Sequence, residues 1–227
     1  MTTAKAYLEP ADVRMLEEQA AYLRDRLLIR VLFRLGCRIS EALGLTVEDV
    51  DFARGMVTIE HLKARVRLSC PDCGARLGKT HAYCPRCGSM VEKALEEEKE
   101  RRRVRTLPVD AQTLEMLREY VDRGGPPQGN AKAFLFAISR HRARQIVREC
   151  AEKAGLPQLV NPETGRVHGV SPHRLRDAFA VHAVKTDASG DGLRLLQEQL
   201  GHASFNTTAR YRKVAGQELK EWYEKLW

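Results

Sequence analysis

The sequence predicts a mainly α-helical domain with a small antiparallel β-sheet (α+β) and a metal-binding module inserted into one β-hairpin. Apolar residues recur at helical spacing through most of the chain. Two β-rich stretches, 56–62 and 104–109, are candidate antiparallel partners, and two C-x-x-C-G motifs fall between them. We therefore expect three segments: 1–63 as the first part of the main domain, 64–103 as the insert, and 104–227 as the second part with a C-terminal tail helix.

The helices are predicted from their starts, their periodicity and their ends. Pro10 suits the first turn of a helix. Apolar residues from Tyr22 to Leu35 repeat at helical spacing until Gly36, where a helix can end. A short helix at 40–43 follows. Further helices are expected at 110–123, 139–153, 171–185, 192–200, 207–214 and 217–226, with a loop at 155–170.

Composition and charge narrow the classes of protein. The chain has 227 residues, 43% apolar and 30% charged, which is typical of a globular protein with a substantial core. Its formal net charge is +8, and residues 131–213 carry 14 Lys and Arg against 7 Asp and Glu. This excess favours a polyanionic partner, with nucleic acid ahead of a membrane surface. Aromatic residues make up only 6%, which argues against a stacking platform for single strands.

The sequence disfavours a membrane or secreted location. No apolar run approaches the ~18 residues of a membrane span, because Arg30 interrupts the best candidate at 27–33. The first residues lack the apolar core of a signal peptide. We expect a cytoplasmic, nucleoid-associated protein without a membrane partner.

Four of the six cysteines form two matched motifs, each followed by Gly and separated by ten residues. They are Cys70, Cys73, Cys84 and Cys87. Four thiolates at this spacing can surround a tetrahedral metal, so we expect one structural Zn²⁺ per chain. Two disulfides would need an oxidising compartment, and a redox C-x-x-C is not expected twice in matched form. Cys37 and Cys150 are expected to be buried small hydrophobes.

A charged run, Glu96 to Arg103, follows the second cysteine motif. Acids followed by bases are typical of a solvated helix or stalk. Alternatively, the three arginines at 101–103 contact the backbone of a nucleic acid.

Three polar islands stand out from the apolar pattern. They are Arg38-Ile39-Ser40-Glu41, His173-Arg174-Leu175-Arg176 and Leu200-Gly201-His202, with Tyr211 nine residues after the last histidine. Singly, each has an ordinary explanation, such as a surface ion pair, a helix start or a turn. His173 and Arg176 lie three residues apart on one helix and therefore share a face, which suits an anion.

Together and in order, the islands resemble the catalytic domain of the tyrosine recombinases, the phage integrase family. The family pattern reads R-x-S-E-x-L, a lysine in a β-hairpin, H-x-x-R, L-G-H, and a tyrosine nine residues after that histidine. Every box has a match here, over about residues 7–214 outside the insert. The lysine matches Lys63, at the end of the first β-rich stretch, with Lys99 beyond the insert as the alternative.

The resemblance implies a site-specific recombinase or integrase that cleaves and rejoins DNA through a covalent 3′-phosphotyrosine. The implied catalytic residues are Arg38, Lys63, His173, Arg176, His202 and Tyr211. Tyr211 is the nucleophile, His173 the base and Lys63 the general acid. The reaction needs no catalytic metal, and no ATP because the covalent link conserves the bond energy. Glu41 is expected to support the Arg38 loop through hydrogen bonds, and His182 to pack in the core.

The resemblance also implies double-stranded DNA as the partner and a homodimer or homotetramer on it. Most family members carry an N-terminal DNA-clamping domain ahead of this pattern, which begins here almost at once. We therefore expect an accessory protein, a separate clamping domain or the insert itself to grip the DNA. Two alternatives stay open: a topoisomerase IB-like enzyme that relaxes DNA, and a non-catalytic DNA-binding regulator with the same fold.

Overall fold

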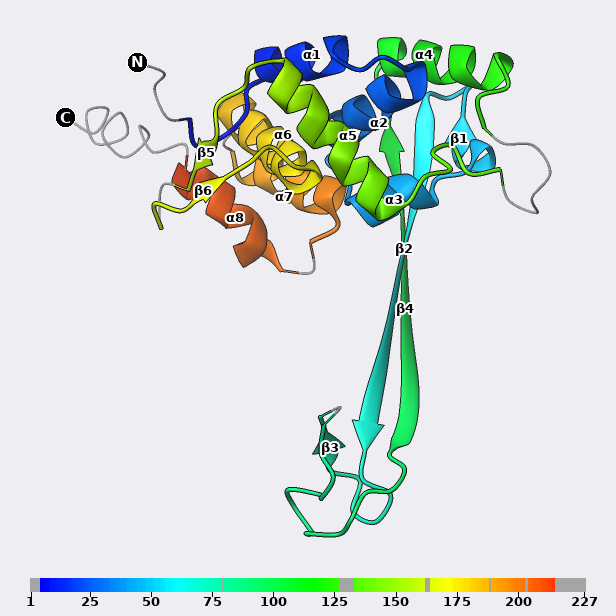
Figure 1. Cartoon of the computed structure of the whole chain (residues 1–227), viewed down its shortest axis with the longest axis vertical. Helices are drawn as coiled ribbons and strands as arrows, with labels where there is room; N and C mark the ends of the chain where they lie inside the picture. The colour runs from blue at the N-terminus through cyan, green and yellow to red at the C-terminus, as the bar shows by residue number, and fades with distance from the viewer. Residues whose placement is uncertain are drawn as a thin grey trace. The chain divides into compact units, whose positions relative to one another are not determined.

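Helices form most of the first of two units, and the chain passes between the units within two long strands (Figure 1). The first unit comprises Met1–Ile59 with Arg105–Trp227, and the second is Glu60–Val104. The computed structural model describes residues 5–78, 80–126, 133–161, 164–187, 189–202 and 204–214, and the side chains within these ranges except at 61–67, 96–103 and 212–214.

The predicted helices are found with small shifts at their ends. They are α1 Pro10–Glu18, α2 Leu23–Arg34, α3 Ile39–Gly44, α4 Ala111–Asp122, α5 Arg140–Lys153, α6 Pro172–Thr186, α7 Gly190–Leu200 and α8 Phe205–Val214, with a 3₁₀ turn at Val47–Asp49. The tail helix expected at 217–226 lies outside the described residues. No described helix has the length and apolar character to cross a membrane.

The strands confirm the α+β class. They are β1 Val50–Asp51, β2 Met56–Ser69, β3 Arg76–Leu77, β4 Leu95–Pro108, β5 Leu159–Val160 and β6 Val167–His168. The long strands β2 and β4 pair and run in opposite directions (Figure 1). β1 pairs antiparallel with the start of β2, with Val50 opposite Val57. β3 pairs with the end of β2, and β5 with β6.

Three expectations were wrong in detail. Residues 96–103 lie in strand β4 and form no helix, because pairing with β2 satisfies the backbone whatever the side-chain charges. The loop expected at 155–170 contains the short strands β5 and β6. His182 is exposed, since Val181 and Val184 take the buried positions on that part of α6.

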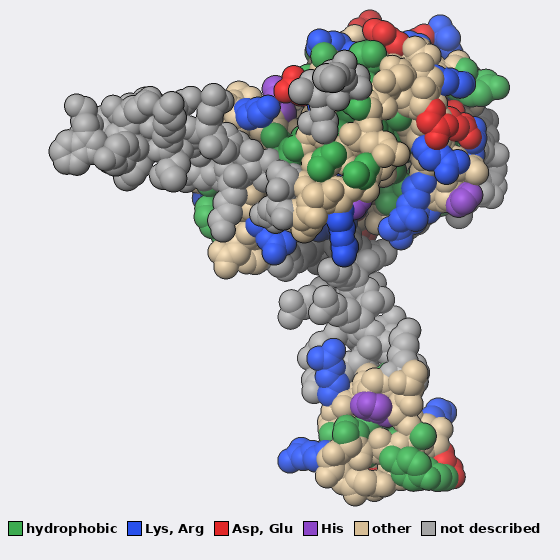
Figure 2. All heavy atoms as spheres, turned by 60° about the vertical axis from the view of Figure 1, so that its left-hand side comes forward, with side chains coloured by type: hydrophobic (Ala, Val, Ile, Leu, Met, Phe, Trp, Pro, Cys, Tyr) green, Lys and Arg blue, Asp and Glu red, His purple; other side chains and the backbone are tan. Residues whose placement is uncertain are grey.

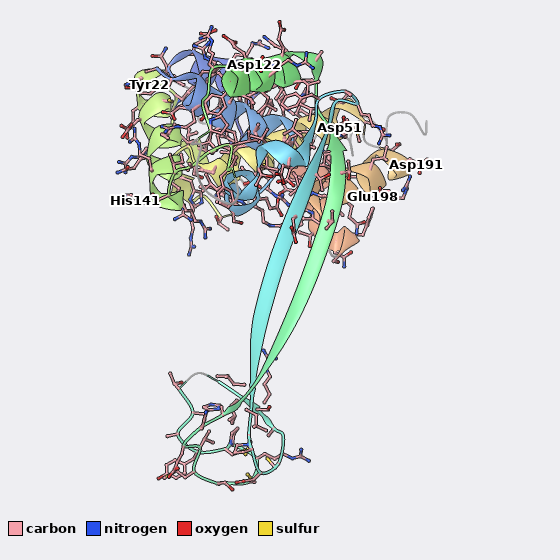
Figure 3. All side chains as sticks on the ribbon, turned by 90° about the vertical axis from the view of Figure 1, so that its right-hand side faces the viewer. Tyr22, Asp51, Asp122, His141, Asp191 and Glu198 are labelled. Carbon is pink, nitrogen blue, oxygen red and sulfur yellow. The ribbon has the colours of Figure 1, made fainter. Side chains whose placement is uncertain are left out.

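α2 lies at the centre of the first unit and packs against α1, α4 and α6. Its residues Leu27, Leu28 and Leu32 are fully buried. A smaller apolar cluster joins α6 and α7, and Tyr211 of α8 packs against it. Polar side chains such as that of His141 on α5 point outward (Figure 3). The cysteines predicted to be buried, Cys37 and Cys150, are 0% and 5% exposed, as expected.

Gly36 ends α2 in the left-handed region, with φ of +58°. A Cβ atom there would lie 2.4 Å from Cδ1 of Phe179 on α6 and 3.0 Å from Cδ2 of Leu200 on α7. The glycine therefore permits both the turn and the close approach of two helices to the chain that leads into α3.

Gly36→Ala should lower the free energy of unfolding by about 3 kcal/mol, because left-handed strain and a steric clash add. The matched control is Gly155→Ala, since Gly155 also has positive φ, +63°, but nothing within 4 Å of its added Cβ. Gly155→Ala should lower the free energy of unfolding by only about 1 kcal/mol. Urea unfolding of both variants measures the difference. Equal losses would contradict the packing role of Gly36.

Candidate active site and cysteine cluster

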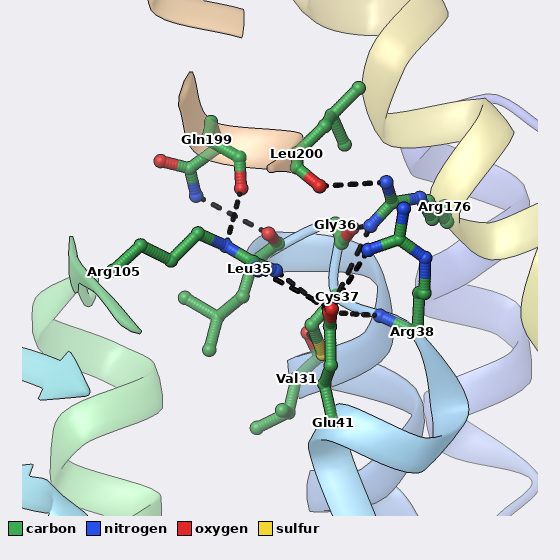
Figure 4. Close-up of polar contacts among 10 residues, drawn as sticks. All are labelled: Val31, Leu35, Gly36, Cys37, Arg38, Glu41, Arg105, Arg176, Gln199 and Leu200. Atoms are coloured by element: carbon green, nitrogen blue, oxygen red, sulfur yellow. Dashed lines mark hydrogen bonds and ion pairs between the residues drawn. The ribbon is translucent and has the colours of Figure 1, made fainter. Parts of the chain in front are cut away.

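The buried carboxylate of Glu41 is the centre of a cluster of arginines (Figure 4). Its side chain is 1% exposed. Arg38, the residue before α3, donates its backbone N–H to Oε2 and its Nη1 to Oε1, both at 2.8 Å. Arg105 of β4 donates Nη2 to Oε2 at 2.7 Å and Nη1 to Oε1 at 3.3 Å. The hydrogen bonds expected between Glu41 and the Arg38 loop are confirmed.

These contacts keep the Glu41 carboxylate ionised. Burial alone would raise its pKa, but hydrogen bonds from Arg105 and Arg38 and the positive charge of Arg105 outweigh burial and lower the pKa to about 2. The side chain of Arg38 remains 35% exposed, so a ligand can reach it from solvent.

Arg176 on α6 approaches the same carboxylate from a buried position. Its Nη1 lies 4.0 Å from Oε2 of Glu41 and its side chain is 4% exposed. Nη1 donates to the carbonyl of Gly36 at 2.6 Å and Nη2 to that of Leu200 at 2.8 Å. The carbonyl of Gly36 lies just beyond the C-terminus of α2, and that of Leu200 lies at the C-terminus of α7. The C-terminal end of a helix dipole is negative, which favours a cation there. Burial, and then the charge of Arg38, lower the pKa of Arg176, which stays a cation because arginine ionises so strongly.

His202 is placed by the end of α7. Gly201 adopts the left-handed conformation, and the backbone N–H of His202 donates to the carbonyl of Gln197 at 3.1 Å. Nδ1 of His202 lies 2.9 Å from Oγ1 of Thr208. Burial, followed by the charges of Arg176 and its neighbouring arginines, lowers the pKa of His202 to about 4. The imidazole is therefore neutral at pH 7.

Tyr211 stacks on His202, with ring centroids 6.3 Å apart and planes 12° apart. Its hydroxyl donates to Oδ1 of Asp177 on α6 at 2.9 Å. Burial, and then the charge and hydrogen bond of Asp177, raise the pKa of Tyr211 well above its usual range. Oδ2 of Asp177 accepts from Arg174 at 3.0 Å and lies 3.8 Å from Nε2 of His173. His173 itself is exposed.

Five of the six residues predicted as catalytic thus lie in two linked clusters. Glu41 connects Arg38 with Arg176, and Asp177 connects His173 with Tyr211, which stacks on His202. Lys63 falls in β2 and Lys99 in β4, in stretches whose side chains lie outside those described. Neither lysine is therefore placed relative to the clusters.

Sequence reasoning missed Arg105 and assigned no role to Asp177. Both had a signal in the sequence. Strand alternation places Arg105 on the same face as buried Leu107 and Val109, which is unusual for an arginine without an acidic partner. Asp177 follows His173 by four residues and therefore shares its helix face.

The second unit brings the four motif cysteines together. Their Sγ atoms all lie within 4.8 Å of one another. The Cys70–Cys87 pair is 3.7 Å apart and the Cys73–Cys84 pair 3.6 Å. The edge of a tetrahedron with metal–sulfur bonds of about 2.3 Å is about 3.8 Å, so these four residues fit a metal ion.

The two cysteine turns share one geometry. The N–H of Gly74 donates to the carbonyl of Cys70 at 2.9 Å, and that of Gly88 to Cys84 at 3.0 Å. Both glycines have positive φ, +67° and +75°. The glycine after each motif therefore permits a tight turn that brings the two cysteines of the motif together.

Glu41→Gln should destabilise the chain at neutral pH, because the lowered pKa of Glu41 corresponds to about 3 kcal/mol of folding free energy. An acid with a depressed folded pKa stabilises above its unfolded pKa and loses that contribution as pH falls through its folded pKa. The difference in the free energy of unfolding between wild type and Glu41→Gln should therefore become smaller as pH falls toward about 2. Urea unfolding over this range, with the exposed acid variant Glu152→Gln as control, measures it. A gap independent of pH would contradict this account.

Comparison with known proteins places the chain in a family. The model of the phage integrase family matches residues 7–72 and 79–218. Tyrosine recombinase XerA of Pyrococcus furiosus is 27% identical over 212 residues, which cover 89% of this chain and 54% of XerA. Tyrosine recombinase XerD of Mycobacterium leprae is 33% identical over 211 residues, which cover 88% of this chain and 51% of XerD. The chain thus spans about half the length of the curated relatives it matches.

Solved structures share the fold. The crystal structure of XerA recombinase superposes with a TM-score of 0.63 at 21% identity, covering 98% of this chain and 66% of that one. XerH site-specific recombinase, in a post-cleavage complex with its palindromic difH substrate, superposes with a TM-score of 0.59 at 24% identity. The match covers 96% of this chain and 52% of the XerH chain. At these identities the likeness concerns the fold alone. Because the family model matches most of its length, the chain belongs to the phage integrase family.

Proposed function

We propose that this chain is a site-specific recombinase that cleaves and rejoins DNA through a 3′-phosphotyrosine on Tyr211. One observation carries the proposal: the ring of Tyr211 stacks on His202, whose pKa is lowered by burial and then by the charges of Arg176, Arg38 and Arg105. A nucleophile, a neutral donor and a cluster of cations are the groups that attack on a phosphodiester requires. The names of the relatives, tyrosine recombinases, support the same activity.

The arginines bind the phosphate that is attacked. In-line attack places negative charge on the equatorial oxygens of the phosphoryl group, and forked guanidiniums match two such oxygens. Arg38 offers a partly exposed side chain, while Arg176 is fixed by two backbone carbonyls. Glu41 neutralises one of the three positive charges and leaves a net positive site.

In the proposed cleavage step, the oxygen of Tyr211 replaces the 5′ oxygen on phosphorus. The oxygen of Tyr211 forms a bond to phosphorus as the bond from phosphorus to the 5′ oxygen breaks. The phenolic proton passes to His173, and the neutral imidazole of His202 donates a hydrogen bond to a non-bridging oxygen. Lys63, or Lys99 in its place, protonates the departing 5′ oxygen. The reverse sequence rejoins strands, with the bond energy held in the phosphotyrosine.

The partner in this proposal is double-stranded DNA, bound by two or four copies of the chain in the cytoplasm. The net charge of +8 suits a polyanion. On the face drawn in Figure 2, Lys and Arg side chains are spread over the first unit among uncharged ones. A structural neighbour, lambda integrase, is described as a dimer bound to a core site, at a TM-score of 0.56.

The test needs no knowledge of the target sequence. The chain is incubated with mixed genomic DNA, denatured and digested with nuclease, and its peptides are analysed by mass spectrometry. We expect a nucleotide on Tyr211, absent from Tyr211→Phe and unaffected by Tyr22→Phe, which changes an exposed tyrosine. DNA bound without any adduct on Tyr211 would contradict the proposal. Sequences recovered with the adduct should share one motif, whereas a relaxing enzyme would return unrelated sequences.

We also propose that Cys70, Cys73, Cys84 and Cys87 hold one structural Zn²⁺. Zinc prefers four thiolates in a tetrahedron, and the sulfur–sulfur distances match one. The ion would supply folding free energy to the second unit, whose apolar cluster, among the described residues, contains three buried side chains, Cys70, Leu77 and Cys84.

Purified chain should contain one zinc ion per molecule by elemental analysis, and replacement with Co²⁺ should give thiolate charge-transfer absorption. Cys73→Ser should lower the zinc content about 10-fold or more after dialysis against a mild chelator, because the substitution removes one of the four ligands. Cys150→Ser, a buried cysteine outside the cluster, should retain the metal. Equal zinc content in the two variants would rule out this site.

A further inference from the structure

Asp177 is a buried acid in direct contact with the nucleophile, and the reaction proposed above does not use it. Its side chain is 8% exposed. Oδ1 accepts the hydrogen bond of the Tyr211 hydroxyl at 2.9 Å, and Oδ2 accepts from Arg174 at 3.0 Å. Asp177 therefore connects the only donor of the phenol with a guanidinium on its own helix.

This contact opposes reaction in two ways. A phenol carries a single O–H donor, so while its hydrogen points at Asp177 it cannot pass to another base. A carboxylate at 2.9 Å also raises the free energy of a phenolate and repels an incoming phosphate, since all three are anions. Both effects persist until Asp177 and Tyr211 separate.

Asp177 is poorly suited to take the proton itself. Its Oδ2 already accepts a hydrogen bond from Arg174 at 3.0 Å, and a proton on the carboxyl group would weaken that charge-assisted bond. In general, proton transfer from a phenol to a carboxylate is uphill, because phenols are much weaker acids than carboxylic acids.

We propose that Asp177 is a positioning residue that holds Tyr211 as a neutral phenol against α6 before DNA binds, and that this hydrogen bond breaks before Tyr211 attacks phosphorus. The breaking of this hydrogen bond before attack rests on the proposed function. The holding contact itself concerns the chain without DNA. His173, 3.8 Å from Oδ2 of Asp177, is placed to receive the phenolic proton once Tyr211 turns away.

The titration of Tyr211 reports on the contact directly. The groups that face its hydroxyl are Asp177 and Arg176 on α6, His202 after α7, and Tyr7 near the start of the chain. Asp177 and Tyr7 raise the pKa of Tyr211 and Arg176 lowers it, while His202 is neutral over the relevant range. Removing the charge of Asp177 should therefore lower the pKa of Tyr211.

The test compares Asp177→Asn with wild type and with Asp25→Asn. Asparagine keeps an oxygen that accepts from the phenol but carries no charge. Asp25 is a matched control, because its side chain is 7% exposed and also pairs with one arginine, Arg24 at 2.8 Å. The full chain is labelled with ¹³C at tyrosine Cζ, and Tyr211→Phe identifies the resonance of Tyr211. NMR follows its titration without DNA, with circular dichroism at each pH to verify folding.

The pKa of Tyr211 should fall by about one unit or more in Asp177→Asn and stay unchanged in Asp25→Asn. With a nicked substrate built on a recovered target sequence, Asp177→Asn should form the covalent adduct at least as fast as wild type. An unchanged pKa in Asp177→Asn overturns the inference whether or not the chain cleaves DNA. A fall in adduct formation of about 100-fold or more would also overturn it, because Asp177 would then be the base. A shifted pKa with no adduct in wild type supports the holding contact and points to failure of the proposed function instead.

Discussion

The arrangement of the site depends on one buried charge, the carboxylate of Glu41. Removing an ion from water costs several kcal/mol unless it is paired and hydrogen-bonded. Arg38 and Arg105 satisfy that requirement, and Arg176 lies 4.0 Å away. Arg38 directly precedes α3, which carries Glu41, while Arg105 and Arg176 lie in β4 and α6, so the acid links three elements at one point. It also lets three guanidiniums share a small volume without dominating repulsion, which leaves net positive charge where a phosphate is expected to bind.

Helix α6 joins this cluster to the nucleophile. Successive residues on a helix point about 100° apart, so adjacent Arg176 and Asp177 face different neighbours. Arg176 is directed at Glu41 and two helix-terminal carbonyls, whereas Asp177 is directed at Tyr211. In the proposed reaction, the same helix thus carries a group that stabilises the negatively charged transition state and a group that holds the nucleophile before DNA binds. Tyr211 lies on α8, whereas the partners of Arg176 lie outside it, so only the second contact depends on the position of α8.

The order of the polar islands was enough to predict the fold class and the family. Five of the six residues predicted as catalytic lie in the two linked clusters around Glu41 and Asp177. The prediction succeeded because the islands around Arg38, His173 and His202 lie at a helix start or end, which sequence patterns reveal well. It failed where partners are distant in sequence. Residues 96–103 are paired in β4, a nonlocal interaction that their charge pattern does not encode. Arg105 and Asp177 gain their roles from acids or hydroxyls 64 and 34 residues away. The choice between Lys63 and Lys99 stays a prediction.

The most direct test is a crystal structure with vanadate and a nicked duplex of a recovered target sequence. Vanadate takes the five-coordinate geometry of a phosphoryl group under in-line attack. Our account predicts vanadium bonded to the oxygen of Tyr211, equatorial oxygens hydrogen-bonded to Arg38 and Arg176, and the bond between Tyr211 and Asp177 broken. Vanadate held away from these arginines, with Tyr211 still donating to Asp177, would contradict it.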